Sequence, residues 1–312
     1  MDLKQIRAFV TVFERGSINS AAANLRVAQP SLSLQIKNLE ESVGVKLFER
    51  HARGVHPTAA GERFYGDCRR ILGDVENAEQ NMREFASGVS GALDVGLIPT
   101  VTKGVLAEVL PAYMEALPNM DVRVVEAYSG NLTSWVMSGE LDFALVTEPP
   151  RHDGLEMRVL SSEPLAIISG RKSGLTHLEP VRLQRMPPVK LVLPSSQHSL
   201  RAIIERYIKL GDIKVERIIE IDGLFGSLEF IRHSDFSAIL PVTTIVRDLD
   251  QGDVVVNPLE DMQTTFEYFL IHQTQRPLSA AARKLVARLE EALRHTARAW
   301  DDVSMKTALA TK

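Results

Sequence analysis

A run of short polar side chains near the N-terminus has the chemistry needed to contact a DNA duplex. Hydroxyl and amide groups can donate to and accept from base edges, and cations can neutralise phosphates. The candidate base-edge contacts are Gln29, Ser31, Ser33 and Gln35, and the candidate phosphate contacts are Lys37, Arg50 and Arg53. Spacing alone also fits a polar, solvated helix face, so both interpretations stay open at this point.

A second polar set follows several predicted strands further along the chain. In open α/β sheets a ligand binds beyond the carboxyl ends of the strands, where helix N-termini favour anions. The side chains expected to touch such a ligand are Thr100, Thr102, Ser129, Asn131, Ser195 and Arg201. One arginine among hydroxyls and an amide would suit a small carboxylate. The competing interpretation is that these Ser and Thr residues only cap helices.

Motifs of the common enzyme classes are missing from the sequence. The chain has no G-x-S-x-G, no phosphate-binding loop, no dinucleotide fingerprint and no H-E-x-x-H. Its eight histidines never fall at zinc-ligand spacing, and its single cysteine, Cys68, excludes an internal disulfide or a thiolate cluster. We therefore expect no enzyme activity, no cofactor and no metal, and histidines that lie at the surface or cap helices.

The elements that must position the first polar set are three short helices and a hairpin. Apolar residues at helical spacing predict helices over 3–15, about 18–25 and about 29–42. Pro30 stands at an early helical position, where its missing N–H costs nothing. Residues 48–58 predict a tight β-wing, after which residue 59 begins another helix. This order is typical of a winged helix-turn-helix, whose third helix fits the major groove.

The next segment predicts a long helix with a narrow apolar seam. The seam follows a strict 3.5-residue repeat through Phe64, Cys68, Ile71, Val75, Ala78, Met82 and Phe85. A narrow seam flanked by charges predicts pairing with a second chain, and packing against the C-terminal part of the same chain is the alternative. Cys68 is then an inert packing residue rather than a redox sensor. Residues 87–91 read as a linker.

Beyond residue 91 the predicted strands and helices alternate. The strands are expected at 93–98, 122–126, 143–146, 191–193, 216–221, 237–240 and 266–272, and the helices at 105–116, 132–138, 200–210, 224–231 and 280–299. Such alternation implies parallel, doubly wound sheets. Two apolar sets of similar length, about 92–162 and 165–265, predict two subdomains that share one crevice.

Length and composition agree with several folded parts. The chain has 312 residues, 45% hydrophobic and 24% charged, which suggests about two domains and excludes wholesale disorder. No long apolar run or signal peptide is evident, so we expect a soluble protein that stays in the cytoplasm, away from any membrane. Residues 1–70 carry a net charge of +4 and the remainder −8. A basic head on an acidic body is typical of a DNA-reading module joined to a sensing module, although chance can also produce it.

About sixty N-terminal residues resemble the LysR-type transcriptional regulators. The matching motifs are SINSAA at 17–22, QPSLS at 29–33, IKNLE at 36–40, GVKLFER at 44–50 and RGVHPTAAG at 53–61, and GELDFA at 139–144 resembles a segment of the family's first lobe. The resemblance implies DNA-reading positions at Gln29, Pro30, Ser31 and Ser33 on the recognition helix and at Arg50 and Arg53 on the wing. Position 34, often a cation in the family, is Leu34 here. Gln35 and Lys37 are therefore expected to contribute more of the contact.

The resemblance also implies partners. Family members bind double-stranded operator DNA as dimers of dimers, so a homodimer through the linker helix and a homotetramer are expected. A small metabolite sets the bend of the operator, and RNA polymerase is a further candidate partner. Where many members carry a glycine-rich segment in the second lobe, this chain has Asp235, which could bind a cationic or hydroxyl group or exclude acidic ligands. The charge of the effector therefore stays open.

The expected fold class is α+β multidomain, with a winged helix-turn-helix, a long linker helix and a two-lobed α/β domain similar to periplasmic binding proteins. The expected domains are 1–60 for DNA binding, 61–88 for the dimerisation helix, 89–300 for effector binding and 301–312 as a flexible tail. Within the effector-binding domain, lobe I takes about 91–162 and 268–300, and lobe II takes about 163–267.

Three hypotheses remain: a ligand-responsive transcription factor, a binding protein with a vestigial DNA module, and a hydrolase on a sensor-like body. Specific operator binding that weakens with salt separates the first from the second, and the third requires turnover of a substrate. Under the first hypothesis, Gln29→Ala should lower operator affinity by ~1–3 kcal/mol. Arg201→Ala should abolish the effector response and leave DNA binding intact.

Overall fold

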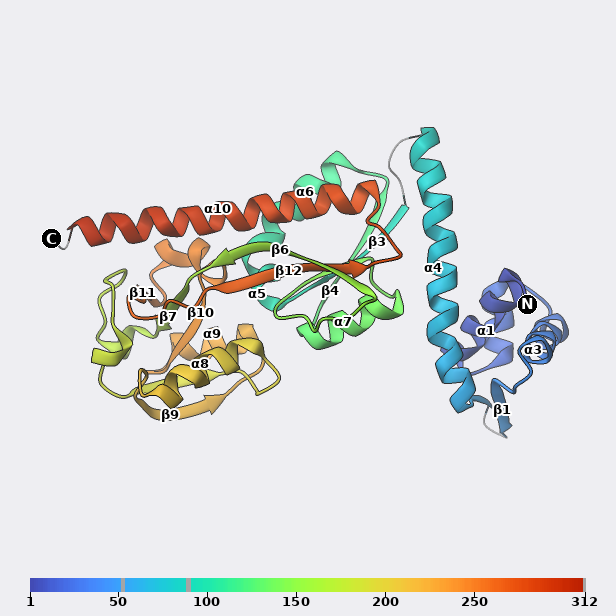
Figure 1. Ribbon diagram of the computed structural model, residues 1–312, viewed down its shortest axis with the longest axis horizontal. Helices are drawn as coiled ribbons and strands as arrows, with labels where there is room; N and C mark the ends of the chain where they lie inside the picture. The colour runs from blue at the N-terminus through green and yellow to red at the C-terminus, as the bar shows by residue number, and fades with distance from the viewer. Residues whose placement is uncertain (52–53, 88–90, 311–312) are drawn as a thin grey trace. The chain divides into compact units, whose positions relative to one another are not determined.

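The computed structural model describes residues 1–51, 54–87 and 91–310 (Figure 1). Contacts divide the chain into two compact units. The first is Met1–Gly91 with Trp135–Leu141, and the second is Ala92–Ser134 with Asp142–Lys312.

The N-terminal unit has the predicted order of elements. It contains α1 (Leu3–Arg15), α2 (Ile18–Leu25), α3 (Gln29–Val43), β1 (Phe48–His51), β2 (Gly54–Pro57) and α4 (Ala59–Ser87). The wing strands β1 and β2 pair antiparallel, with Phe48 opposite Pro57. The three predicted helices are confirmed to within about a residue, because their boundaries are set locally. A capping box of Asp2 and Gln5 begins α1, and Gly16, at φ 61°, ends it.

The packing of α3 in the core of this unit determines which face of the helix is exposed. Leu32, Ile36 and Leu39 of α3 are buried against α1 and α2, which leaves the opposite face of α3 outward. The first half of the predicted α4 seam also belongs to this core. Cys68 is fully buried, and Phe64 and Ile71 pack against the same cluster. Cys68 is therefore occupied by the core of its own domain, whereas Phe64 and Ile71 are only partly buried.

The second unit contains two five-stranded sheets, in the orders β4-β3-β5-β12-β6 and β11-β7-β10-β8-β9. We call the first sheet with its helices lobe I and the second lobe II. The strands of lobe I are β3 (Gly91–Leu97), β4 (Met120–Glu126), β5 (Phe143–Val146), β6 (Leu155–Glu163) and β12 (Phe266–Gln273). Those of lobe II are β7 (Leu165–Ser169), β8 (Val189–Leu193), β9 (Val215–Glu220), β10 (Ser237–Pro241) and β11 (Val255–Pro258).

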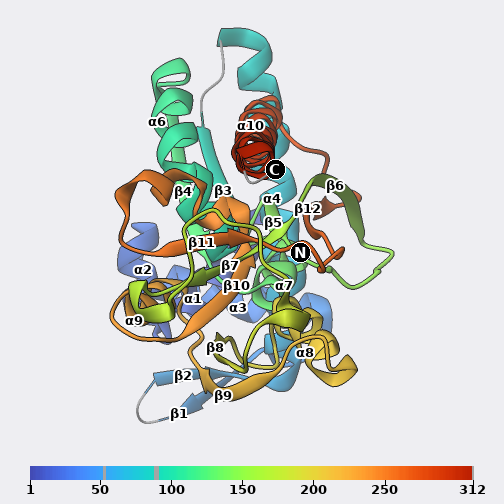
Figure 2. The ribbon, with the colours of Figure 1, turned by 90° about the vertical axis from the view of Figure 1, so that its left-hand side faces the viewer.

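Helices flank both sheets. Those before β6 are α5 (Pro99–Val101), the π-helix η1 (Thr102–Leu106), α6 (Ala107–Ala116) and α7 (Ser129–Ser138). Later come α8 (Ser199–Leu210), α9 (Leu224–Arg232), α10 (Ala280–Ala310) and the 3-10 turns η2 (Arg171–Ser173), η3 (Leu183–Arg185), η4 (Val242–Thr244) and η5 (Val246–Gln251). Figure 2 shows α8 and α9 on opposite sides of the strands of lobe II, as in a doubly wound sheet.

The prediction of parallel sheets is wrong for part of each sheet. β12 runs antiparallel to β5 and β6, and β7 runs antiparallel to β10 and β11, while β3–β5 and β8–β9 are parallel. The antiparallel strands adjoin the places where the chain passes between the lobes, between Glu163 and Leu165 and again between Pro258 and Phe266. A strand reached by such a passage needs no helical crossover, so its direction is not set by the βαβ rule.

The C-terminal helix is longer than predicted. α10 continues to Ala310, so residues 301–310 are helical, beyond the helix predicted at 280–299 and into the segment that was expected to be a flexible tail. Trp300 and Thr296 on α10 are almost fully buried, and α10 contacts η4 and η5, which extends the packing of the helix. Among the described residues, no helix combines the length and apolar character required to cross a bilayer.

Candidate DNA-reading face and effector cavity

The outward face of α3 is open and polar. Gln29, Pro30 and Ser31 are exposed in its first turn. An open groove between α3 and the wing is lined on the α3 side by Gln29, Ser33 and Lys37. The Gln29 Nε2 amide donates to Ser33 Oγ at 3.1 Å. The face therefore has hydrogen-bonding groups at the N-terminal end of a helix with the dimensions that fit a major groove.

The predicted DNA-reading residues fall into three groups. Gln29, Pro30, Ser31 and Lys37 are exposed on α3, whereas Ser33 and Gln35 are half-buried. Lys37 Nζ lies 3.6 Å from Glu41 Oε1 in an exposed ion pair that can open at little cost. Two further residues were predicted to contact DNA, and both are outside what the structure describes: all of Arg53 and the side chain of Arg50.

A buried carboxylate connects α3 to the wing. Glu40 is only 8% exposed, and its oxygens accept from the Leu47 and Phe48 amides at 2.9 and 3.2 Å and from Lys46 Nζ at 2.7 Å. Burial alone would raise the pKa of Glu40, but the ammonium and the two amides outweigh it and hold that pKa below its ordinary value. Glu40 therefore fixes the start of β1 relative to α3.

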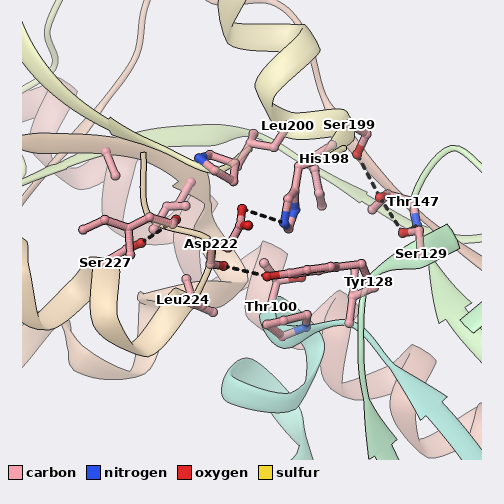
Figure 3. Close-up of a pocket in the computed structure, with 17 residues that line it drawn as sticks. Thr100, Tyr128, Ser129, Thr147, His198, Ser199, Leu200, Asp222, Leu224 and Ser227 are labelled. Carbon is pink, nitrogen blue, oxygen red and sulfur yellow. Dashed lines mark hydrogen bonds and ion pairs between the residues drawn. The ribbon is translucent and has the colours of Figure 1, made fainter. Parts of the chain in front are cut away.

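The second unit contains a cavity of about 80 Å³ between its two lobes (Figure 3). Lobe I contributes the residues that follow β3, β4 and β5, and lobe II those that follow β8 and β9, together with β10 and the start of α9. The polar lining residues are Thr100, Tyr128, Ser129, Thr147, His198, Ser199, Asp222 and Ser227. The apolar walls include Ile98, Leu200, Ile221, Leu224, Leu240 and Phe266. This is the edge at which open α/β sheets bind ligands.

Three contacts join the lobes directly across this cavity (Figure 3). The Tyr128 hydroxyl donates to the Asp222 carbonyl at 3.2 Å, and the Tyr128 ring meets the His198 ring edge-on with centroids 4.2 Å apart. Thr147 Oγ1 and Ser199 Oγ share a hydrogen bond of 2.8 Å. A ligand that enters here must therefore touch groups that already set the spacing of the lobes.

The charges around the cavity do not favour an anion. Burial lowers the pKa of His198 although Asp222 opposes the shift, so the ring is neutral at pH 7. The Ser195 amide donates to Asp222 Oδ1 at 2.7 Å and lowers the pKa of that carboxyl, which stays ionised. No lysine or arginine belongs to the described lining of the cavity.

Two of the six predicted effector residues, Thr100 and Ser129, line the cavity. The Ser129 hydroxyl accepts from the Thr147 amide at 3.1 Å. The Thr100 hydroxyl is buried, makes no hydrogen bond of ordinary length to described residues, and lies near the Tyr268 phenol.

The structure does not bring the other four predicted residues to the cavity. The Thr102 hydroxyl donates back to the Ile98 carbonyl, Asn131 is exposed, and Ser195 directs its amide and its side chain to Asp222. The Arg201 guanidinium is taken up by Glu205 at 2.7 Å, by the Pro194 carbonyl at 3.0 Å and by Glu220 at 3.5 Å. Arg201 therefore holds the loop beside the cavity rather than facing into it.

Sequence reasoning missed the residues that connect the lobes. Tyr128 and Asp222 each lie two residues past the end of a strand, so the rule about carboxyl ends could have found them. His198 lines the cavity half-buried, where the histidines were expected at the surface or as capping residues. Asp235, considered for ligand recognition, instead pairs with Lys190 Nζ at 2.7 Å, outside the lining.

Comparison with known proteins covers nearly the whole chain. Residues 3–62 match the family model of the bacterial regulatory helix-turn-helix protein, lysR family, and residues 86–294 match the model of the LysR substrate binding domain. The HTH-type transcriptional regulator BbuR of Bordetella bronchiseptica is 28% identical over 84% of this chain and 80% of that protein. The regulator CfxR of Cupriavidus necator is 26% identical over 95% and 92%.

Solved structures share the fold. Full-length OxyR from Pseudomonas aeruginosa is 21% identical, with a TM-score of 0.73 over 96% of this chain and 97% of that one. Full-length CbnR in complex with its target DNA is 23% identical, with a TM-score of 0.63 over 95% of this chain and 100% of that one.

Proposed function

Because the chain belongs to the LysR family of DNA-binding transcriptional regulators, we propose that a small effector in the interlobe cavity controls its action on operator DNA. The proposal rests on one observation. The cavity lies where Tyr128, His198, Thr147 and Ser199 join the two lobes, so an occupant changes the contacts that set the lobe spacing. A ligand shifts such an equilibrium only by its different affinities for the two arrangements, and these residues supply that difference.

We propose that the effector is a compact, largely apolar molecule with a hydroxyl or amide rather than a carboxylate. Apolar walls surround a few hydroxyls, and Asp222 is the ionised group at the rim. A carboxylate there would be desolvated without a guanidinium or ammonium partner, which costs free energy. The sequence-based expectation of a carboxylate depended on Arg201, whose guanidinium is engaged elsewhere.

On the DNA side, α3 is the proposed reading helix, with Gln29, Ser31 and Ser33 facing base edges. We propose that the protein acts in the cytoplasm as a homodimer joined through the second half of α4, since the first half is buried in its own domain. Assembly of two dimers into a tetramer and contact with RNA polymerase are proposals that rest on the family resemblance.

A thermal-shift screen of matched sets tests the effector proposal. Each set contains the acid, amide and alcohol of one small carbon skeleton, and a ligand of the folded state raises the melting temperature. Hits are then titrated against Thr100→Val and Thr102→Val. Thr100→Val changes the polarity of a residue that lines the cavity, so binding should weaken about 5- to 10-fold. Thr102→Val is the control, because its hydroxyl faces the helix backbone.

Equal affinity of the two variants would place the ligand elsewhere, and preferential stabilisation by acids would refute the uncharged effector. Footprinting on operator DNA with and without the hit completes the test. A hit that leaves the footprint unchanged would refute control of DNA binding through the cavity, whereas a chain that binds no specific DNA would support a binding protein with a vestigial DNA module.

A further inference from the structure

Leu34 is exposed in the middle of the reading helix. The side chain of Leu34 is 56% exposed. All residues of α3 are described, and Leu34 is the one large apolar residue among them that is exposed. The buried apolar residues of the helix, Leu32, Ile36 and Leu39, lie on its other face. Leu34 therefore adds nothing to the domain core, and its apolar surface meets solvent in the free protein.

Its neighbours place Leu34 on the surface that faces DNA. It lies one helical turn from Pro30 and from Lys37, and all three line the groove between α3 and the wing. The hydrogen-bonded pair Gln29 and Ser33 lies beside it on the same helix. An apolar side chain thus stands among the polar groups proposed to read base edges.

The chemistry of the major groove restricts what Leu34 can contact there. A leucine neither donates nor accepts, so it cannot bind a phosphate or the polar edge of guanine, adenine or cytosine. The C5-methyl group of thymine is the apolar feature that this groove displays. We propose that Leu34 packs on a thymine methyl and selects a T·A pair at one position of each operator half-site. The inference rests on the proposed use of α3 as the reading helix.

Removal of the single methyl group tests the contact. The operator is first selected from random duplex DNA with the full-length protein, and each thymine is then replaced by deoxyuridine, which keeps base pairing. One replacement per half-site should weaken binding by the wild-type protein about 2- to 5-fold, as expected for one buried methyl. At that position, 5-methylcytosine paired with guanine should bind more tightly than cytosine paired with guanine.

Three variants assign the effect to the side chain. Leu34→Ala should bind the thymine and deoxyuridine duplexes equally. Leu34→Arg should move the preference at that position from thymine to guanine, since an arginine can bond to guanine O6 and N7. Leu3→Ala is the control, because Leu3 is also an exposed leucine, 42% exposed, on α1. It should keep the wild-type sensitivity to deoxyuridine.

Each result that contradicts the Leu34 proposal has a distinct interpretation. If the protein selects no sequence, the proposed function fails. If it selects one but Leu34→Ala keeps the full deoxyuridine effect, or no thymine methyl matters, the assignment to Leu34 is overturned. A change of oligomeric state in Leu34→Ala, with unchanged base preference, would instead assign this leucine to a protein contact.

Discussion

A hydrogen bond within α3 holds the Gln29 side-chain amide in place in the DNA-free protein. Its Nε2 donates to Ser33 Oγ at 3.1 Å, one turn further along α3. Fixing an exposed glutamine side chain in advance removes part of the entropy cost of binding.

Gln29→Ala should therefore weaken binding to the selected operator by ~1–3 kcal/mol, with little change on scrambled DNA. Gel-shift titrations at several salt concentrations measure both affinities. Gln263→Ala, at an exposed glutamine of the second unit, is the matched control. Equal losses on operator and scrambled DNA would show that Gln29 does not read bases.

Glu163 is a buried carboxyl at the end of β6, where the chain passes between the lobes. Its oxygens accept from the Thr243 amide at 3.1 Å, the Thr243 hydroxyl at 2.5 Å and the Tyr268 hydroxyl at 2.5 Å. Burial raises the pKa of Glu163 to about 7 even though all three hydrogen bonds lower it. Near pH 7 the Glu163 carboxyl is therefore partly protonated and partly ionised.

The raised pKa of Glu163 predicts a pH-dependent stability. Between pH 4.5, the ordinary pKa of the carboxyl, and about 7, the folded protein binds more protons than the unfolded chain. The free energy of unfolding should thus fall as pH rises through this window, by at most ~3 kcal/mol. Glu163→Gln should remove this part of the slope, so that its stability relative to wild type improves from pH 5 to pH 8.

Urea unfolding at several pH values measures the difference between Glu163→Gln and wild type. Glu179→Gln, at an exposed glutamate, serves as the control for loss of a carboxyl. The same pH slope in all three proteins would mean that Glu163 titrates as it does in water.

At the scale of elements, Glu40 couples the reading helix to the wing. Glu40→Ala should lower the free energy of unfolding of the N-terminal unit by roughly 2–4 kcal/mol, because the Leu47 and Phe48 amides lose their acceptor. Since its pKa is lowered, the stability that Glu40 contributes is present at neutral pH and is lost as pH falls through the folded-state pKa. Thermal unfolding followed by circular dichroism measures the loss.

The neighbouring Glu41 is the matched control for Glu40. It is exposed, and within the described part of the chain its ion-pair partner is Lys37, at 3.6 Å, so Glu41→Ala should cost less than about 0.5 kcal/mol. If the two substitutions cost the same, the hydrogen bonds of Glu40 contribute nothing net to stability.

Elements set by neighbours in sequence could be predicted, and those set by distant partners could not. The caps and periodicity that bound α1 to α3 lie within a few residues of each helix. By contrast, β6, β7 and β11 went unpredicted, and the direction of β12 depends on β5 and β6, more than a hundred residues away in the chain. The same holds for the cavity. The sequence could predict which loops form it, but it could not predict that Arg201 pairs with Glu205 and Glu220 instead of facing the cavity.

At the scale of the whole molecule, α4 has two roles along its length. Its first half closes the core of the N-terminal unit, while Val75 is half-buried and Ala78 exposed further along. A dimer seam should therefore begin near Val75 rather than at Phe64, which shortens the apolar repeat that was expected to pair.

Ala78→Asp should shift the full-length protein from dimer toward monomer, because it places two like charges in the seam without touching the N-terminal core. Analytical ultracentrifugation measures the change, and operator affinity should fall with it. Ala107→Asp, at an exposed alanine of α6, should leave the dimer intact. A stable dimer in Ala78→Asp would move the association to another surface.

The return of β12 and α10 to lobe I has a consequence for how the protein is made. The first sheet lacks its fourth strand until the ribosome has translated residue 273. At typical elongation speeds that is roughly 10 to 35 s after residue 91 has been added. The N-terminal unit can thus fold on the nascent chain well before the second unit is complete. A truncated translation product would therefore carry the N-terminal helix-turn-helix unit without a complete first sheet of the effector-binding part.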